Sequence, residues 1–322
     1  RPLMSASHSI HDTAHPEHEE ALEGLPPGFG DGLSGKIAFW IAFVFSLFQL
    51  FVAAYGTLPS QILRALHVGF LVLLGCVLIS NLVMKTKLGK IWYWIVGLAG
   101  FATGLYSWIF YTDIIQRTGY LTTADLVTGT VLIVVVFIAS RQLMGWPLAI
   151  IASLFLAYAA FGEYAPGVFQ TRGYDFAQLV ENFSFGTEGI YGTPIYVSSS
   201  YIFIFVVFAA FLERAGMLNL FNDFALGLVG HLRGGPAQVA VLSSALMGTI
   251  SGSGVANVVA SGQFTIPLMK KFGFRSAFAG GVEATASMGG QIMPPVMGAV
   301  ASIMPETLGV EYVGLAKAAV IP

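Results

Sequence analysis

Six long apolar runs, separated by short polar segments, dominate the first two thirds of the chain. Runs of this length come near the roughly 20 residues that a helix needs to cross a bilayer, and flanking polar residues complete the shorter ones. Because the runs are continuously apolar rather than alternating, they predict transmembrane helices and argue against an outer-membrane barrel. They cover about residues 38–56, 66–84, 91–110, 126–140, 146–162 and 195–212.

The composition agrees with this pattern. The chain is 56% hydrophobic and 10% charged, and its mean hydropathy of +0.76 is higher than an ordinary soluble domain tolerates. We therefore expect an all-α integral membrane protein with several spans. The net charge of -2 and the lack of a basic stripe outside the membrane-flanking loops indicate no nucleic-acid partner. The single cysteine, Cys76, allows no intrachain disulfide and is expected to be a small buried residue.

The first residues of the chain have a different character. Residues 1–35 are polar, rich in glycine and proline, and lack the hydrophobic region of a signal peptide, so they predict a disordered tail. Four histidines in this tail have no cysteine partner and no packed surroundings, which favours a solvated tail over a metal site. They are His8, His11, His15 and His18. Because the chain starts without methionine and stops early in an apolar run, we expect a fragment of a longer protein.

The distribution of lysine and arginine near the span ends predicts the orientation. A cytoplasmic N-terminus places ten basic residues on the inner side: Lys36, Lys85, Lys87, Lys90, Arg141, Arg214, Arg233, Lys270, Lys271 and Arg275. The outer side then holds Arg64, Arg117 and Arg172. In this orientation the segment 162–192 lies outside and carries more acidic than basic residues, so it is either a solvated loop or a surface that docks a partner.

Beyond residue 230 the pattern changes to shorter apolar stretches. Residues 236–270 begin just after Arg233 and end at lysines, so both ends are expected on the cytoplasmic side. The two arms, 236–250 and 255–269, each rise about 22 Å as helix, which is short of the roughly 30 Å hydrocarbon core. We therefore predict a re-entrant helical hairpin whose tip is the sequence SGSG, residues 251–254, where the glycines permit a tight reversal.

The predicted hairpin tip combines two kinds of binding group. The end of the first arm presents carbonyl oxygens, which suit a cation, and the start of the second arm presents N–H groups, which suit an anion. The alternative is that serine and glycine only allow close helix packing. We predict that a cation binds Ser251, Gly252, Ser253 and Gly254, and that an anionic solute contacts Ser253 and Asn257.

A second interruption follows in the next span, at the sequence GGQIMPP, residues 289–295. The two prolines remove backbone donors and free carbonyl oxygens upstream, while the two glycines tolerate an unwound backbone. Such oxygens are the hard ligands that Na⁺ accepts. We predict that this break shares one cation with the hairpin tip through Gly289, Gly290, Gln291 and Pro294.

Glu283 is expected inside the membrane, about eight residues and roughly 12 Å from Arg275. Intramembrane carboxylates are costly and mark functional sites by default. Three roles stay open: a proton relay, a part of the ion site, or an acceptor of hydrogen bonds from a neighbouring helix. We include Glu283 and Ser287 among the residues predicted to contact the solute.

Residues 232–305, and more loosely 130–322, resemble the large membrane subunit of tripartite ATP-independent periplasmic (TRAP) transporters. The resemblance rests on HLRGGPAQVAVLSSALMGTISGSGVANVVASGQFTIPLMKKFGF followed by VEATASMGGQIMPPVMG. These two sequence stretches are most similar to the TAXI-type branch, in which the small and large membrane subunits are fused in one chain. Both interruptions occur in order, which makes the signal specific.

The resemblance implies a division of the chain. Residues 36–125 correspond to the small subunit, 126–215 to a scaffold, and 216–322 to an arm helix at 217–231, the hairpin and the broken helix of a transport domain. It also implies an elevator mechanism, sodium sites at the tip and the break, and a soluble periplasmic protein that delivers an organic acid. An inverted second half is expected in the remainder of a longer protein.

We therefore expect a secondary active transporter subunit of the bacterial or archaeal cytoplasmic membrane. It would import dicarboxylates, oxoacids or acidic amino acids with Na⁺ or H⁺, without an organic cofactor. An ATP-driven pump is disfavoured because no GxxxxGK[ST] loop occurs. An intramembrane enzyme is disfavoured because no HExxH motif occurs and only His67 and His231 lie beyond the tail. A passive channel for small anions stays open, since only accumulation against a gradient distinguishes it.

Overall fold

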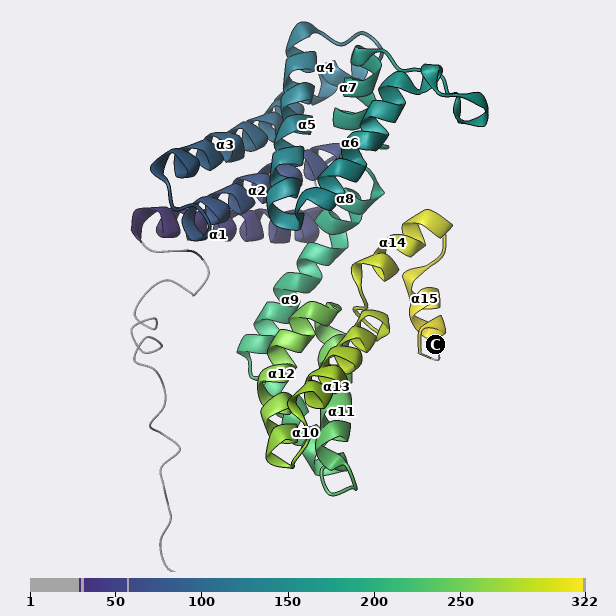
Figure 1. Ribbon diagram of the computed structural model, residues 1–322. Coiled ribbons are helices and arrows are strands. Elements are labelled where there is room, and N and C mark those ends of the chain that lie inside the picture. The colour runs from purple at the N-terminus through teal and green to yellow at the C-terminus, as the bar shows by residue number, and fades with distance from the viewer. Residues whose placement is uncertain (1–28, 30–31, 57, 321–322) are drawn as a thin grey trace, which may run out of the picture. The chain divides into compact units, whose positions relative to one another are not determined.

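The computed structural model describes residue 29 and residues 32–56 and 58–320, and every regular element in this part is helical (Figure 1). Six of the helical segments are long and apolar enough to cross a membrane, and each contains most of one predicted apolar run. The prediction of an all-α, multi-span membrane protein is therefore confirmed. The four histidines of the predicted tail lie outside the described residues, and the first helix begins at Gly32, within the last residues of that tail.

Four of the candidate spans are single helices. They are α1 (Gly32–Tyr55), α2 (Ser60–Leu82), α3 (Lys87–Ile109) and α5 (Thr123–Met144). The fifth span, Trp146–Tyr164, consists of α6 (Trp146–Phe161) and the 3₁₀ turn η3 (Gly162–Tyr164). In the last span the π-helical turn η5 (Ser198–Ile202) joins α8 (Thr193–Val197) to α9 (Phe203–Arg214), and the connections contain α4 (Tyr111–Gln116) and the 3₁₀ turn η4 (Gly167–Phe169).

The helices group into two compact units. The described residues up to Phe45, with Val68–Leu179, form the first unit, and Ser46–His67 with the residues from Val180 onward form the second. In the first unit, α3 packs against α5 and α5 against α6. Glycines permit the close contact of α2 with α3, because a Cβ on Gly97 would lie 3.1 Å from the Cβ of Cys76. Cys76 is fully buried, as predicted.

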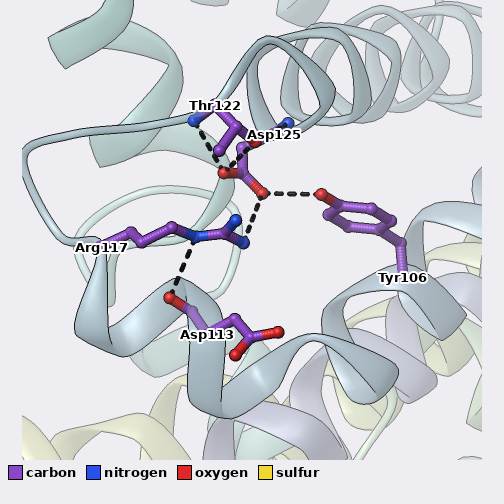
Figure 2. Close-up of polar contacts among 5 residues, drawn as sticks. All are labelled: Tyr106, Asp113, Arg117, Thr122 and Asp125. Carbon is purple, nitrogen blue, oxygen red and sulfur yellow. Dashed lines mark hydrogen bonds and ion pairs between the residues drawn. The ribbon is translucent and has the colours of Figure 1, made fainter.

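A buried carboxylate fixes the start of α5 in the first unit (Figure 2). The hydroxyl and the backbone N–H of Thr122 donate to Asp125, and the Asp125 N–H donates back to the Thr122 hydroxyl, which completes a capping box. The Tyr106 hydroxyl donates to the other carboxylate oxygen at 2.7 Å, and Arg117 forms an ion pair with it at 3.4 Å. Asp125 thereby connects α3, the segment after α4, and α5.

We expect Asp125→Ala to lower the free energy of unfolding by about 2–3 kcal/mol, because it removes the carboxylate half of the capping box, with three hydrogen bonds from Thr122 and Tyr106, and the ion pair with Arg117. The measurement is denaturant unfolding of the detergent-solubilised protein. Asp113→Ala is the matched control, since Asp113 is exposed and only its backbone carbonyl contacts Arg117. A loss in Asp113→Ala as large as that in Asp125→Ala would contradict this account.

The second unit contains the hairpin and the broken helix that the sequence predicts. Helices α10 to α13 pack side by side (Figure 1), with an apolar core of Ala240, Met269 and Ala279. The predicted arm helix at 217–231 corresponds to α10. The elements are α7 (Phe176–Ser184), which begins in the first unit, then α10 (Met217–Val229), α11 (Gly235–Ser251), α12 (Gly254–Lys271), α13 (Ser276–Gly289), η6 (Gly290–Ile292), α14 (Ala299–Leu308) and α15 (Tyr312–Ala318).

A series of buried side-chain hydrogen bonds in the second unit reaches the π-helical turn. The Gln49 side-chain amide of α1 pairs with the His67 ring of α2, and the other ring nitrogen of His67 lies 3.0 Å from the Ser198 hydroxyl of η5. Gln49 and His67 are 1% exposed, so these bonds satisfy polar groups that have no access to water in this structure. These hydrogen bonds attach the π-helical turn to α1 and α2.

Candidate functional site

The hairpin tip is built by two helices that meet across two residues. Helix α11 ends at Ser251 and is followed by the cap residue Gly252, whose φ of +59° lies in the left-handed region and whose N–H donates to the carbonyl of Gly248 at 3.2 Å. A Cβ at Gly252 would collide with the carbonyl oxygen of Met297, so only glycine fits there. Ser253 then caps α12 by accepting a hydrogen bond from the N–H of Ala256.

The two arms are slightly longer than the sequence suggests. They contain 17 and 18 residues. As helices they rise about 26 Å, which is still short of the roughly 30 Å hydrocarbon core. The two-helix hairpin with its tip at residues 251–254 is therefore present, and its re-entrant path through the membrane stays a prediction.

The second interruption lies where the sequence places it. Helix α13 ends at Gly289, passes into the 3₁₀ turn η6, and the chain does not resume a helix until Ala299. The freed backbone groups find partners nearby: the Gly298 N–H donates to the Gln291 carbonyl at 2.7 Å. The Tyr312 hydroxyl lies 2.8 Å and 2.6 Å from the carbonyl oxygens of Pro295 and Val296. Local hydrogen bonds thus hold the break open.

Two glycines bring the tip and the break together. A Cβ on Gly248 would collide with the Cα of Gly290, and a Cβ on Gly290 would lie 2.8 Å from the Cα of Gly248. The backbones of α11 and η6 are therefore in direct contact, one turn before the hairpin tip. A Cβ on Gly254 would lie 3.2 Å from the side-chain amide nitrogen of Gln291, so α12 also begins against the break.

One cavity of about 430 Å³ is lined by the tip, the break, the start of α14 and the α9 region. Its polar groups are few and stand in a mostly apolar wall, which is typical of a small-molecule site. Four of the eight residues predicted to bind a cation line it: Ser251, Gly252, Ser253 and Gln291. The other four are Gly254 and Gly290, which pack between the helices, and Gly289 and Pro294, which are not among the lining residues.

The predicted solute-contacting residues do not all reach this cavity. Ser253 lines it, whereas Asn257, Glu283 and Ser287 are 0% exposed and lie among α11, α12 and α13. The Asn257 amide donates to the Ser244 carbonyl at 2.8 Å. These three residues therefore stand behind the tip in this structure.

A ring of hydroxyl groups surrounds the Glu283 carboxylate. Ser244 of α11 donates to one carboxylate oxygen at 2.9 Å, and Ser287 of α13 donates to it at 3.0 Å. Ser261 of α12 bonds to that oxygen too, and Thr265 of α12 donates to the other. Each of the three helices thus contributes a hydroxyl to one buried carboxylate. We call these five residues the Glu283 ring.

The sequence analysis did not identify Ser244, Ser261 or Thr265. A signal was available, because Ser261 and Thr265 are four residues apart on one helix, as are Glu283 and Ser287. Residues with this spacing share a helix face, so each pair marks a polar stripe on an apolar helix. The spacing does not show that the two stripes face each other, nor that Ser244 completes the ring.

A sequence profile described as "Tripartite ATP-independent periplasmic transporter, DctM component" matches residues 131–322, more than half of the chain. The chain belongs to this family. The predicted resemblance to the TRAP large membrane subunit is thereby confirmed. The fused small subunit and the TAXI type stay predictions.

Several curated TRAP permeases are similar to part of the chain. The C4-dicarboxylate TRAP transporter large permease protein DctM of Pseudomonas aeruginosa is 38% identical over 91 residues, which are 28% of this chain and 21% of that protein. The sialic acid TRAP transporter large permease protein SiaM of Vibrio cholerae is 33% identical over 91 residues, with the same shares. The chain thus spans about a fifth of the length of these relatives. No solved structure matches it.

The contact of Gly248 with Gly290 generates a stability prediction for this TRAP permease segment. We expect Gly248→Ala to destabilise the protein by about 1–3 kcal/mol, because the added methyl group must separate two backbones that touch. Thermal unfolding of the purified protein measures the effect.

Gly281→Ala is the matched control for this substitution. Gly281 lies within α13, and a Cβ there meets nothing within 4 Å. Alanine favours a helix over glycine by up to about 1 kcal/mol, so this variant should be neutral or slightly more stable. Equal stability of the two variants would refute a tight contact between the tip and the break.

Proposed function

We propose that this TRAP permease segment forms the solute and cation site of a secondary active transporter that imports small organic acids. One observation carries the proposal: the hairpin tip and the helix break line the same cavity. Both are interruptions in apolar sequence, and at membrane depth such interruptions are tolerated where they are buried in protein or line a polar cavity.

The hairpin tip places groups that can bind a cation next to groups that can bind an anion. The carbonyl end of α11 carries the negative end of a helix dipole, and the Ser251 hydroxyl adds an oxygen next to it. The first turn of α12 carries the positive end of a dipole and presents N–H groups, which attract a carboxylate. On this basis the cation binds Ser251, Gly252 and Gln291 with the hydroxyl of Ser253, and the solute carboxylate binds the α12 terminus.

The class of solute is inferred from the relatives. The similar permeases are named for C4-dicarboxylate and for sialic acid, and both are organic acids. We extend that class to this chain, with dicarboxylates, oxoacids and acidic amino acids as its members. The resemblance to TAXI-type transporters further supports a periplasmic binding protein as partner, a cytoplasmic-membrane location and an elevator movement of the hairpin with the broken helix.

A passive anion channel is the competing function. A channel and a coupled transporter share a polar cavity within an apolar bundle, so geometry does not separate them. The distinguishing experiment is uptake of radiolabelled organic acids into proteoliposomes that contain the complete transporter and its binding protein, under an imposed Na⁺ or H⁺ gradient. Accumulation above the external concentration supports coupled transport, whereas equilibration regardless of the gradient supports the channel.

Ser253→Gly tests the tip in the same assay. Glycine is nearly as good a helix cap as serine, so this change removes the hydroxyl ligand while α12 keeps its start. A hydrogen bond or ligand to a charged group is worth about 1.5–3 kcal/mol, so we expect the apparent cation affinity to fall about 10- to 100-fold.

The matched control is Thr249→Ala, one turn before the tip. The Thr249 hydroxyl donates to the Leu246 carbonyl of its own helix at 2.6 Å and lies outside the cavity lining. Its uptake should stay near that of the wild type. Unchanged cation dependence in Ser253→Gly would remove the Ser253 hydroxyl from the proposed site.

A further inference from the structure

The Glu283 ring is unusual because its carboxylate is fully buried and its partners are hydroxyl groups rather than a basic residue. Helix α11 contains no charged side chain at all. On α12 the only charged residues are Lys270 and Lys271, in its last turn, and Arg275 precedes α13. Lys270 lies five residues beyond Thr265, about 7.5 Å along the helix, and Arg275 lies about 12 Å from Glu283.

A buried carboxylate without a cationic partner is costly when it is ionised, and the cost decreases with each hydrogen bond that it accepts. Hydroxyl groups suit this position because each of them both donates and accepts. A lysine or arginine would stabilise only the ionised form. The ring is therefore chemically suited to a carboxyl group that changes its protonation state.

The hydroxyl groups have other hydrogen-bond acceptors available when Glu283 is protonated. The Ser261 hydroxyl also lies 2.8 Å from the Asn257 carbonyl, and the Thr265 hydroxyl lies 3.0 Å from the Ser261 carbonyl. The Ser244 hydroxyl is 3.1 Å from that of Ser261 and 3.4 Å from that of Ser287. A hydroxyl that turns to a backbone carbonyl exposes its lone pair, which accepts a hydrogen bond from a protonated Glu283. Both protonation states are thus fully hydrogen-bonded.

We propose that Glu283 binds and releases the coupling proton of this transporter. In the loading step a proton from water forms an O–H bond with a carboxylate oxygen, and in the release step the same bond breaks and returns the proton to water. No electron transfer or other reactant is involved. The inference rests on the proposed function, because it assigns a coupling ion to the same transport domain.

The ring is connected to the hairpin tip through Asn257. This residue lies in the first turn of α12, donates to the Ser244 carbonyl, and contacts the Ser261 hydroxyl at 3.4 Å through its side-chain oxygen. It also packs against Gly290 of the break. Asn257 therefore links the hydrogen-bond donors around Glu283 to a residue of the break. A static ring would instead serve only to pack three helices together.

Glu283→Gln distinguishes the two roles, because the amide retains hydrogen bonds to the hydroxyl groups but exchanges no proton. The assay uses the complete transporter and its binding protein in proteoliposomes, with the membrane potential clamped to zero. One proton per solute across about one pH unit supports about tenfold accumulation in the wild type. In Glu283→Gln we expect the accumulation ratio to fall to one, while exchange of labelled for unlabelled solute continues.

Glu213→Gln is the control, since Glu213 is an exposed carboxylate in the last turn of α9. It should accumulate solute as the wild type does. Accumulation by Glu283→Gln under the pH gradient overturns the proposal. Accumulation by the wild type with Na⁺ alone, unaffected by the pH gradient, also overturns it, although the proposed transport function then stands.

An infrared measurement tests the proton site independently of transport and of the folding of Glu283→Gln. The wild-type protein is titrated with acid, and the carbonyl stretch of a protonated carboxyl group is recorded. Thr265→Val removes one hydrogen bond from that group, so we expect it to shift the frequency of the band. A band that is absent, or that Thr265→Val leaves unchanged, overturns the proposal even if no uptake is observed.

Discussion

A helix that is interrupted inside a bilayer must satisfy its freed backbone groups within the protein, and the second unit is organised around this constraint. At the break, the N–H of Gly298 bonds to the Gln291 carbonyl, and the Tyr312 hydroxyl reaches two further carbonyls. At the tip, Gly252 closes α11 and Ser253 caps α12. Ser251, Gly252, Ser253 and Gln291 line one cavity between the tip and the break, which is why we place binding there.

The same unit depends on close contacts between small residues. Gly248 and Gly290 bring two backbones together, and this contact leaves the Ser244 hydroxyl within reach of a carboxylate on α13. The Glu283 ring then joins α11, α12 and α13 by hydrogen bonds. Helices connected in this way are suited to move as one body, in agreement with the elevator movement that we propose.

Much of this arrangement could be predicted from the sequence, because its signals are local. Continuous apolar runs identified the six spans, and the SGSG and GGQIMPP sequences located the tip and the break within a residue or two. The Glu283 ring was not predicted, because it depends on which faces of three helices meet. For the same reason Asn257, Glu283 and Ser287 were predicted to contact solute, although they lie behind the cavity in this structure.

The most direct test of the central claim is a cryo-electron microscopy structure of the complete transporter with its organic acid and coupling cation bound. Our account predicts density for the solute between the hairpin tip at Ser251–Gly254 and the break that begins at Gly289. Solute density at a different site, with the tip–break cavity closed by side chains, would contradict the account.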